Sequence, residues 1–293
     1  MTDPGPLKIA IASGKGGTGK TFLATTMAAL LSETQKILLV DLDVEEPNDL
    51  LFFQGTTTDV IHQYKMIPAW DEGRCTHCGA CTKNCNYHAV ISLGDHITVF
   101  NELCHSCHAC SELCPAGALT MTTHPLGTIK IVLKNSLTVI ESRLEIGEEQ
   151  SVPLIRQTHA FVDEYSHNIP VQIFDCPPGT SCPMVNSVKE CDFVLLVTEP
   201  TPFGLNDLTL AVETIKQLEK PFGVVINREG TGNEDVLNYC LQEQIAVIGR
   251  IPYDRKIAEC YSRGVLYHDT DPNLVSVIQQ IIISVGKIIG KHE

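Results

Sequence analysis

The sequence predicts an α/β fold in which a mostly parallel, doubly wound sheet carries a small inserted metal-binding domain. Apolar strands alternate with helical stretches near both ends of the chain, a rhythm typical of parallel sheets covered on both faces. A glycine-rich loop follows the first strand, and eight cysteines gather in the middle of the chain. With 293 residues, 43% of them hydrophobic, the chain is long enough to bury a large core.

The first elements form a βαβ unit. The apolar run Leu7–Ala12 predicts a buried strand, and the glycine-rich loop follows it directly. Helical spacing over Thr21–Ser32 predicts a helix, and Lys36–Val40 predicts a second strand. Strand, loop, helix and strand in this order are the setting in which a glycine-rich motif becomes a credible phosphate site.

The second half of the chain predicts the rest of the sheet and a final helix. Leu274–Ile289 has an apolar stripe at helical spacing and few basic residues on its polar face. We expect this helix to pack on the core, because membrane-bound amphipathic helices favour Lys and Arg on that face. Four apolar runs separated by helical stretches predict further parallel strands: Val171–Asp175, Phe193–Thr198, Phe222–Asn227 and Ala246–Gly249.

The middle of the chain predicts an insertion. The sheet pattern breaks after about Asp59, and the segment Arg74–Val90 then aligns with Leu103–Leu119 at an offset of 29 residues. A short two-fold repeat of this kind can hardly build a core without metal. We therefore expect an inserted domain at residues 61–124, between the two parts of a nucleotide-binding domain at residues 1–60 and 125–293.

The cysteine spacing predicts two cubane iron–sulfur clusters. Each of two runs reads C-x2-C-x2-C-x3-C, and this constant step of three suits a cubane face better than it suits zinc, the rival metal. In bacterial two-cluster ferredoxins the fourth cysteine of each run ligates the other cluster. One departure is that Asn86, not proline, follows the first run. On this pattern one [4Fe-4S] cluster takes Cys75, Cys78, Cys81 and Cys114, and the other takes Cys104, Cys107, Cys110 and Cys85.

The glycine-rich loop predicts a site for ATP or ADP. Its glycines let backbone N–H groups approach phosphate closely, and the following helix adds the positive end of its dipole. Lys20 would reach the β- and γ-phosphates, and the Thr21 hydroxyl would bind Mg²⁺. The motif consists of Gly14, Lys15, Gly16, Gly17, Thr18, Gly19, Lys20 and Thr21.

The Gly-Lys-Gly-Gly start of this loop resembles the MinD/Mrp-type ATPases with a deviant Walker A motif, which share a fold with the nitrogenase iron protein. The resemblance implies a P-loop NTPase sheet, Mg-dependent ATPase activity and an ATP-dependent homodimer. In such a dimer Lys15 would reach across to the partner's nucleotide, much as an arginine finger does. The cysteine insertion narrows the resemblance to members that contain an inserted ferredoxin-like domain.

Other positions resemble site residues of that family. Asp43 matches the aspartate that positions the attacking water, a role for which Asp41 is the lesser candidate. Asp175 precedes Cys176–Thr180, which resembles the DxPPG switch element, and its carboxylate would hold Mg²⁺ through water. Two further positions resemble groups that contact the base or close over it: Asn227 and Pro252.

Composition excludes several classes of protein. The net charge is −14 and Lys and Arg do not cluster, so we expect no nucleic-acid partner. The first residues lack a signal segment and the cysteine spacing is metal-like, which indicates a reducing cytoplasm. No apolar run is expected to be long enough to span a membrane.

Together these features predict an ATP-dependent iron–sulfur protein. Nucleotide binding and hydrolysis would switch the elements around Asp43 and Asp175, and electrons would pass to a redox or iron–sulfur protein partner whose basic patch suits this acidic chain. Two alternatives stay open: a cluster carrier or assembly scaffold, and an ATP-gated positioning protein with structural clusters. Cys182 stands at an offset from Asp175 like that of a cluster ligand in the nitrogenase iron protein, and it would either join a bridging cluster at a subunit interface or be a buried thiol.

Overall fold

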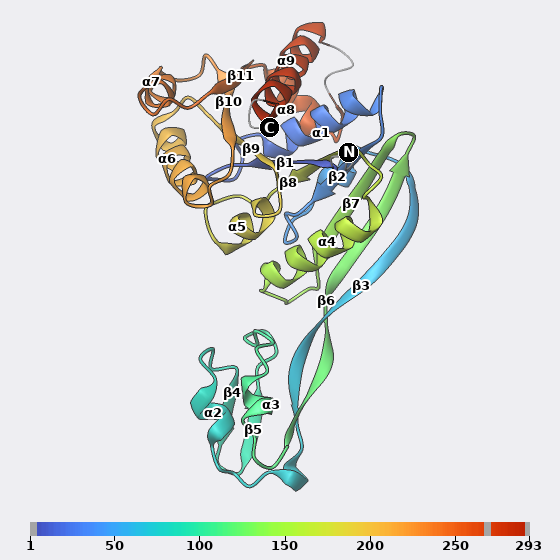
Figure 1. Ribbon diagram of the computed structural model, residues 1–293, viewed down its shortest axis with the longest axis vertical. Helices are drawn as coiled ribbons and strands as arrows, with labels where there is room; N and C mark the ends of the chain where they lie inside the picture. The colour runs from blue at the N-terminus through green and yellow to red at the C-terminus, as the bar shows by residue number, and fades with distance from the viewer. Residues whose placement is uncertain (1–4, 267–270, 291–293) are drawn as a thin grey trace.

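The computed structural model describes residues 5–266 and 271–290, which form an α/β body and a small module at the end of a long two-stranded ribbon (Figure 1). The body is built on a nine-stranded sheet with the order β11-β10-β9-β1-β8-β2-β7-β6-β3. Strands β11 to β7 in this order are parallel, and β6 and β3 are antiparallel. The strands are β1 (Leu7–Ala12), β2 (Ile37–Asp41), β3 (Thr56–Trp70), β6 (Leu119–Lys134), β7 (Leu137–Leu144), β8 (Val171–Asp175), β9 (Phe193–Thr198), β10 (Phe222–Glu229) and β11 (Val247–Pro252).

The predicted parallel strands are confirmed, with β1, β8 and β9 at their predicted bounds. The sequence missed β7, in which polar Thr138, Glu141 and Ser142 are buried among apolar neighbours. The parallel register brings the carboxyl ends of β1, β2 and β8 together, because Ile11 and Asp41 both pair with Asp175. The loops that follow these strands therefore start side by side, at the edge where open α/β sheets bind ligands.

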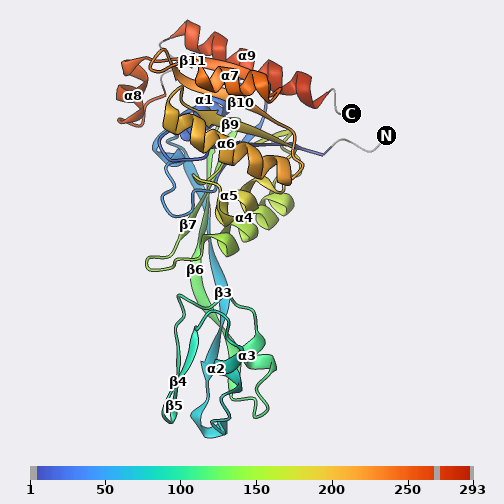
Figure 2. The same ribbon diagram turned by 90° about the vertical axis from the view of Figure 1, so that its left-hand side faces the viewer.

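Helices cover both faces of the body sheet, as the doubly wound prediction requires (Figures 1 and 2). Alternate residues of each strand enter opposite cores, so Phe174 packs in one and its neighbour Ile173 in the other. One face is covered by α4 (Ser151–Tyr165), α5 (Cys182–Val188), α6 (Pro202–Gln217) and α7 (Asp235–Gln242), and the other by α1 (Lys20–Ser32), α8 (Arg255–Tyr261) and α9 (Pro272–Ile289).

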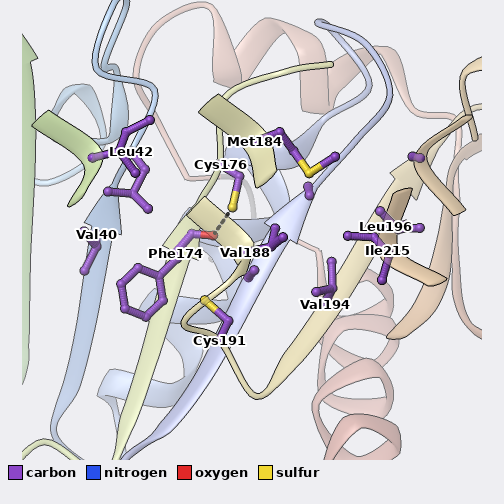
Figure 3. Close-up of a cluster of buried hydrophobic side chains, with 14 of the residues drawn as sticks. Val40, Leu42, Phe174, Cys176, Met184, Val188, Cys191, Val194, Leu196 and Ile215 are labelled. Atoms are coloured by element: carbon purple, nitrogen blue, oxygen red, sulfur yellow. Dashed lines mark hydrogen bonds between the residues drawn. The ribbon is translucent and has the colours of Figure 1, made fainter. Parts of the chain in front are cut away.

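Three of the cysteines outside the central runs are buried in the first of these cores: Cys176, Cys191 and Cys240. Figure 3 shows Cys176 and Cys191 among Met184, Val188 and other apolar side chains, with the Cys176 thiol donating to the Phe174 carbonyl oxygen at 3.6 Å. Burial raises the pKa of both thiols, so they stay protonated and act as small apolar residues. Cys182 differs, because it is exposed at the first residue of α5.

Helix α9 packs on the core, as expected. Its residues Leu274, Ile278, Ile281 and Val285 are buried on the face formed with α1 and β11. The helix approaches β11 closely, because a Cβ at Gly249 would stand 2.3 Å from the Ile281 side chain. The expectation that no segment is long and apolar enough to span a membrane is wrong. By length and composition alone, helix Pro272–Ile289 is long and apolar enough. Core packing accounts for its apolar stripe.

Strands β3 and β6 form the ribbon that leads from the body to the module. They pair from Thr56 opposite Leu133 to Trp70 opposite Leu119, with a β-bulge between Gln63 and Tyr64. The sheet pattern was expected to end at about Asp59, which is wrong because β3 continues to Trp70. Much of β3 is exposed, so it lacks the apolar signature of the buried strands. The predicted boundaries at 60 and 124 fall within β3 and β6.

The module consists of short elements around the cysteines. Its small core contains Val90, Ile97, Cys110 and Leu119, packed against Trp70. The 29-residue repeat reappears in the backbone, because three pairs of residues at that offset share positive φ: His77 and Ser106, Gly79 and His108, and His88 and Gly117. The module's elements are α2 (Ala80–Asn84), β4 (Val90–Leu93), β5 (His96–Val99) and α3 (Ala109–Glu112), and short 3₁₀ turns lie at Glu72–Arg74 and, in the body, at Asp49–Leu51.

Candidate nucleotide site and cysteine cavities

A cavity of about 400 Å³ lies at the carboxyl edge of the body sheet, around the glycine-rich loop. Most of the predicted nucleotide-site residues line it, and Gly14, Lys15, Thr18 and Asp175 lie outside its lining. Asn48 and Tyr261 also line it, and no motif in the sequence marks them. The predicted residues in the lining are Gly16, Gly17, Gly19, Lys20, Thr21, Asp43, Asn227 and Pro252.

Backbone constraints fix the shape of the glycine-rich loop. Gly17 and Gly19 adopt positive φ of 77° and 101°, and a Cβ at Gly14 would stand 2.1 Å from the Asp207 carbonyl oxygen of α6. From β10, Asn227 Nδ2 donates to the Thr18 carbonyl oxygen at 2.7 Å, and Arg228 Nη2 donates to the Gly17 carbonyl oxygen at 3.0 Å. Asn227 therefore holds the loop as well as lining the cavity.

Thr21 and Asp175 form the part of the site that fits a cation. Thr21 Oγ1 donates to Asp175 Oδ2 at 2.5 Å, and Asp175 Oδ1 is buried without a hydrogen-bond partner among the described residues. Burial raises the pKa of Asp175 to about 6, against the opposing effects of the Lys20 ammonium and the Thr21 hydrogen bond. The carboxyl is therefore mostly ionised at neutral pH, with one oxygen available to a hydrated Mg²⁺.

The two aspartates of the Asp-Leu-Asp segment have different surroundings. Asp41 is buried, and its oxygens accept from the backbone N–H groups of Asp43, Asn48 and Asp49 at 3.1, 2.8 and 3.0 Å. Its carboxyl thus shapes the loop from Leu42 to Asp49. Asp43 faces the cavity, and burial raises its pKa to about 6. Of the two, Asp43 is the one placed to meet a bound ligand.

Asp49 is a buried acid that sequence reasoning missed. It is fully buried, and neither of its carboxyl oxygens has a hydrogen-bond partner among residues 5–266 and 271–290. One ligand atom each from Asp41, Asp49 and Asp175 lie within 4.8 Å of one another. Burial, followed by the charge of Asp41, raises the pKa of Asp49. Nothing in the local sequence distinguishes Asp49 from a solvated loop acid.

Lys15 lies beside the cavity rather than in its wall. It is half-buried, and its backbone carbonyl accepts from Ser13 Oγ at 2.5 Å. Within the described part of the chain no hydrogen bond or ion pair engages its ammonium group. The side chain is thus available to a group outside this subunit.

The eight cysteines of the module line two small cavities. The structure brings together the same two sets of four that the crossed ferredoxin pattern predicts. Cys75, Cys78, Cys81 and Cys114 line the first cavity, and Cys85, Cys104, Cys107 and Cys110 line the second.

The chemistry of both cavities fits thiolate ligands. The backbone N–H groups of Ala89 and Ala118 donate to Cys85 Sγ at 3.3 Å and to Cys114 Sγ at 3.2 Å, at equivalent positions of the repeat. Burial opposes ionisation of Cys114, but backbone N–H groups including that of Ala118 outweigh it and lower the pKa. Burial and neighbouring cysteines raise the pKa of Cys110 to about 11, and a coordinated metal would remove this proton.

Comparison with known proteins gives sequence relatives of two kinds. The uncharacterized protein MJ0579 of Methanocaldococcus jannaschii is 29% identical over 258 residues, which cover 87% of this chain and 89% of the relative. The iron-sulfur cluster carrier protein of Pyrococcus furiosus is 24% identical over 288 residues, covering 90% of this chain and 80% of the relative.

Solved structures and a family model agree on the fold. The septum site-determining protein MinD of Pyrococcus horikoshii, complexed with Mg-ADP, superposes with a TM-score of 0.62 at 17% identity, covering 98% of this chain and 99% of that one. The cell division ATPase MinD of Pyrococcus furiosus gives 0.59 at 19% identity, covering 96% and 99%. The family model for the CobQ/CobB/MinD/ParA nucleotide binding domain matches residues 9–267. With its glycine-rich loop at the carboxyl edge of a parallel sheet, the chain belongs to this family of P-loop ATPases.

Proposed function

We propose that this protein binds and hydrolyses ATP and couples its nucleotide state to electron transfer or partner docking through two [4Fe-4S] clusters. One observation carries the proposal. A single chain holds a nucleotide-sized cavity at the glycine-rich loop and two cavities lined by four cysteines each, joined by the continuous strands β3 and β6. Neither a plain ATPase nor a plain ferredoxin requires both.

In the body, the position of each residue at the nucleotide cavity supports its proposed role. The loop backbone and Lys20 bind the phosphates, and Thr21 with Asp175 holds Mg²⁺. Asp43 orients the attacking water, because it faces the cavity while Asp41 is engaged by backbone N–H groups. Two further lining residues border the space for the base: Asn227 and Pro252.

In the module, each set of four cysteines would hold one cluster. A bound [4Fe-4S] cluster supplies a one-electron redox centre. The protein's part is to present the thiolates, to stabilise them with backbone N–H groups such as that of Ala118, and to bury Cys104 and Cys110 away from water. We take residues 61–124 as this ferredoxin-like domain, inserted between 1–60 and 125–293 of the ATPase domain.

Two partners complete the proposal. The Lys15 ammonium, which pairs with none of the residues that the structure describes, supports an ATP-dependent homodimer, in which each Lys15 serves the nucleotide of the other subunit. The net charge of −14 supports docking of a redox protein through a basic patch on that protein.

Cluster carriage is the second candidate function. The likeness to the iron-sulfur cluster carrier proteins of Pyrococcus favours it. Transfer requires accessible, labile ligands, whereas Cys104 and Cys110 are buried in a closed set of four. Retained clusters therefore suit the cavities better. A positioning protein whose clusters only stabilise the module is a third reading.

Anaerobic purification followed by iron, sulfide and ATPase assays tests the proposal. The clusters are then reduced with dithionite and followed by electron paramagnetic resonance with and without Mg-ATP. The proposed function predicts reversible signals that respond to nucleotide in the wild type and not in Lys20→Ala. Carriage predicts loss of cluster to an apoprotein acceptor, and a positioning protein predicts neither. Folded protein that is free of iron would overturn all cluster-based readings.

A further inference from the structure

A buried ion pair lies where the ribbon leaves the body. Lys65, midway along β3, has a side chain only 2% exposed, and its Nζ is 2.6 Å from Glu148 Oε2, whose side chain is 4% exposed. The same Nζ donates to the Asn101 carbonyl oxygen at 2.8 Å. Glu148 belongs to the body and Asn101 to the module. One ammonium group therefore bonds to both parts of the molecule.

The two residues that flank Lys65 on β3 also bond to the two parts of the molecule, one to the body and one to the module. The Tyr64 carbonyl oxygen accepts from Gln157 Nε2 of α4 at 2.9 Å, and the Met66 carbonyl oxygen accepts from Ser106 Oγ of the module at 2.6 Å. The pairing of β3 with β6 changes register directly before these residues, because Gln63 pairs with Gly127 and Tyr64 with Pro125. The segment from Tyr64 to Met66 is thus a junction with the body on one side and the module on the other.

On the module side, the hydrogen bonds of the junction include the backbone of Cys104, one of the proposed cluster ligands. The Asn101 carbonyl oxygen that accepts from Lys65 also accepts from the Cys104 backbone N–H at 3.2 Å. The Glu102 carbonyl oxygen accepts from Gln150 Nε2 of the body at 3.0 Å. The turn from Asn101 to Cys104 is held by the body.

On the body side, the junction leads back to the nucleotide cavity. Glu148 and Gln150 stand immediately before α4, and Arg156 of α4 donates from Nε to Asn186 Oδ1 of α5 at 2.8 Å. His159 Nε2 lies 3.1 Å from the Ser187 carbonyl oxygen, which makes a second link between these helices. Helix α5 begins seven residues after Asp175, and Pro178 of the connecting loop lines the cavity. A shift of that loop would thus move α5 and α4 together.

We propose that Lys65, through its bonds to Glu148 and Asn101, is the positioning residue that transmits nucleotide state to the cluster held by Cys85, Cys104, Cys107 and Cys110. The inference rests on the proposed function. A buried ion pair is weak as a stabilising device, because desolvation offsets much of its attraction, and its value here is a fixed geometry. The cavity of Cys75, Cys78, Cys81 and Cys114 has no such link to the body among the described residues, so its cluster would respond less.

The test compares Lys65→Met/Glu148→Gln with the wild type as intact, cluster-loaded protein. The double change removes both charges, so no buried ion is left without a counterion. Two quantities are measured with and without Mg-ATP: the reduction potential of each cluster, and amide hydrogen exchange of residues 100–106. In the wild type both should respond to nucleotide, the potential mainly at one cluster. In the double variant the response should fall at least fivefold, with iron content and ATP affinity unchanged.

Two further variants make the result decisive. Glu148→Gln alone keeps the Lys65 bond to Asn101 but weakens the link to the body, so it should also reduce the response if the double variant fails to fold. Lys216→Met breaks the exposed Lys216–Glu243 pair and should behave as wild type. An undiminished response in both Lys65 and Glu148 variants overturns this inference and leaves the proposed function standing. A wild type without any nucleotide response overturns both.

Discussion

At the scale of single residues, the carboxyl groups beside the glycine-rich loop differ in what surrounds their oxygens. Asp41 accepts backbone hydrogen bonds, whereas Asp49 is fully buried and accepts none from any described residue. Asp175 lies beside them with one oxygen unpartnered. Buried charge without a partner is unfavourable, so this arrangement favours the uptake of a cation or a proton.

Asp49→Asn should raise the free energy of unfolding of the nucleotide-free protein near neutral pH. Burial raises the folded-state pKa of Asp49 above 3.8, so its ionised form destabilises the fold. This destabilisation is complete above the folded-state pKa and vanishes as the pH falls toward 3.8, at about 1.4 kcal/mol for each unit of difference. The gain should therefore shrink on acidification. Urea unfolding across a pH series measures it, with exposed Glu149→Gln as the control, and an Asn variant less stable than wild type near neutral pH contradicts the prediction.

Lys20→Ala and Lys15→Ala should separate binding from hydrolysis. Lys20 lines the cavity, so its loss should abolish measurable ATP and ADP binding. Lys15 lies outside the lining, so its variant should bind nucleotide normally while hydrolysis falls by roughly 10³-fold. Fluorescent-nucleotide titration and phosphate release measure the two effects. If Lys15→Ala loses nucleotide affinity instead, Lys15 acts within its own subunit.

At the scale of elements, burial on both faces decided what the sequence could predict. Strands such as β8 and β9 are buried on both sides and read as continuous apolar runs, so their bounds were predicted to the residue. The first half of strand β3 is mostly exposed and has few apolar residues, so hydrophobic periodicity could not reveal this strand.

The parts of the site that depend on local sequence motifs were predictable, and the parts that depend on long-range contacts were not. Loop glycines and cysteine spacings are local in sequence, and the structure places most of the predicted residues in the linings of three cavities. Asp49, Tyr261 and the Lys65–Glu148 pair depend on contacts between distant segments, which no local pattern records.

Cys114→Ser should damage the cavity of Cys75, Cys78 and Cys81, although Cys114 belongs to the other run. Anaerobic alkylation and peptide mapping should find those three thiols newly reactive, because their cluster has lost a ligand. Cys85→Ser is the matched control and should instead expose the thiols of the second run. The reverse outcome, with each variant exposing its own run, would show that the ligands do not cross.

Ile278→Ala in α9 should lower the free energy of unfolding by about 2–4 kcal/mol, because it leaves a cavity in the core. Ile283→Ala in the same helix is a matched control, since that side chain is 50% exposed, and should change stability by less than about 0.5 kcal/mol. Denaturant titration compares the two variants. Equal effects would contradict the packing of α9 on the core.

At the scale of the whole molecule, the nucleotide cavity and the cysteine cavities lie in different parts of an elongated chain (Figures 1 and 2). Communication between them has to travel along the ribbon or through the junction at Lys65. Nucleotide binding can drive such a change only if two states of the protein differ in their affinity for nucleotide, and the proposed ATP-dependent dimer would supply that difference.

Mg-ATP should convert the protein from monomer to dimer when hydrolysis is slow. Asp43→Ala should retain ATP and therefore show the larger dimer fraction, because Asp43 faces the cavity without belonging to the phosphate-binding loop. Light scattering after size-exclusion chromatography, with ADP as the control nucleotide, measures the mass. A mass that stays monomeric in Mg-ATP at saturating nucleotide would contradict the trans role of Lys15.

The module joins the ribbon at two strand ends that lie side by side. Trp70 pairs with Leu119, and the next backbone rung is already in place because the Asp71 N–H donates to the Ala118 carbonyl oxygen at 2.8 Å. The entry and exit of the module are thus neighbours, as in an ordinary hairpin. A two-residue type I′ turn grafted there would close the strands, with loss of the hydrogen bonds from Lys65 to Asn101 and from Gln150 to Glu102. Gain or loss of the module would thus have left the pairing of β3 with β6 intact and changed the contacts at the Lys65 junction.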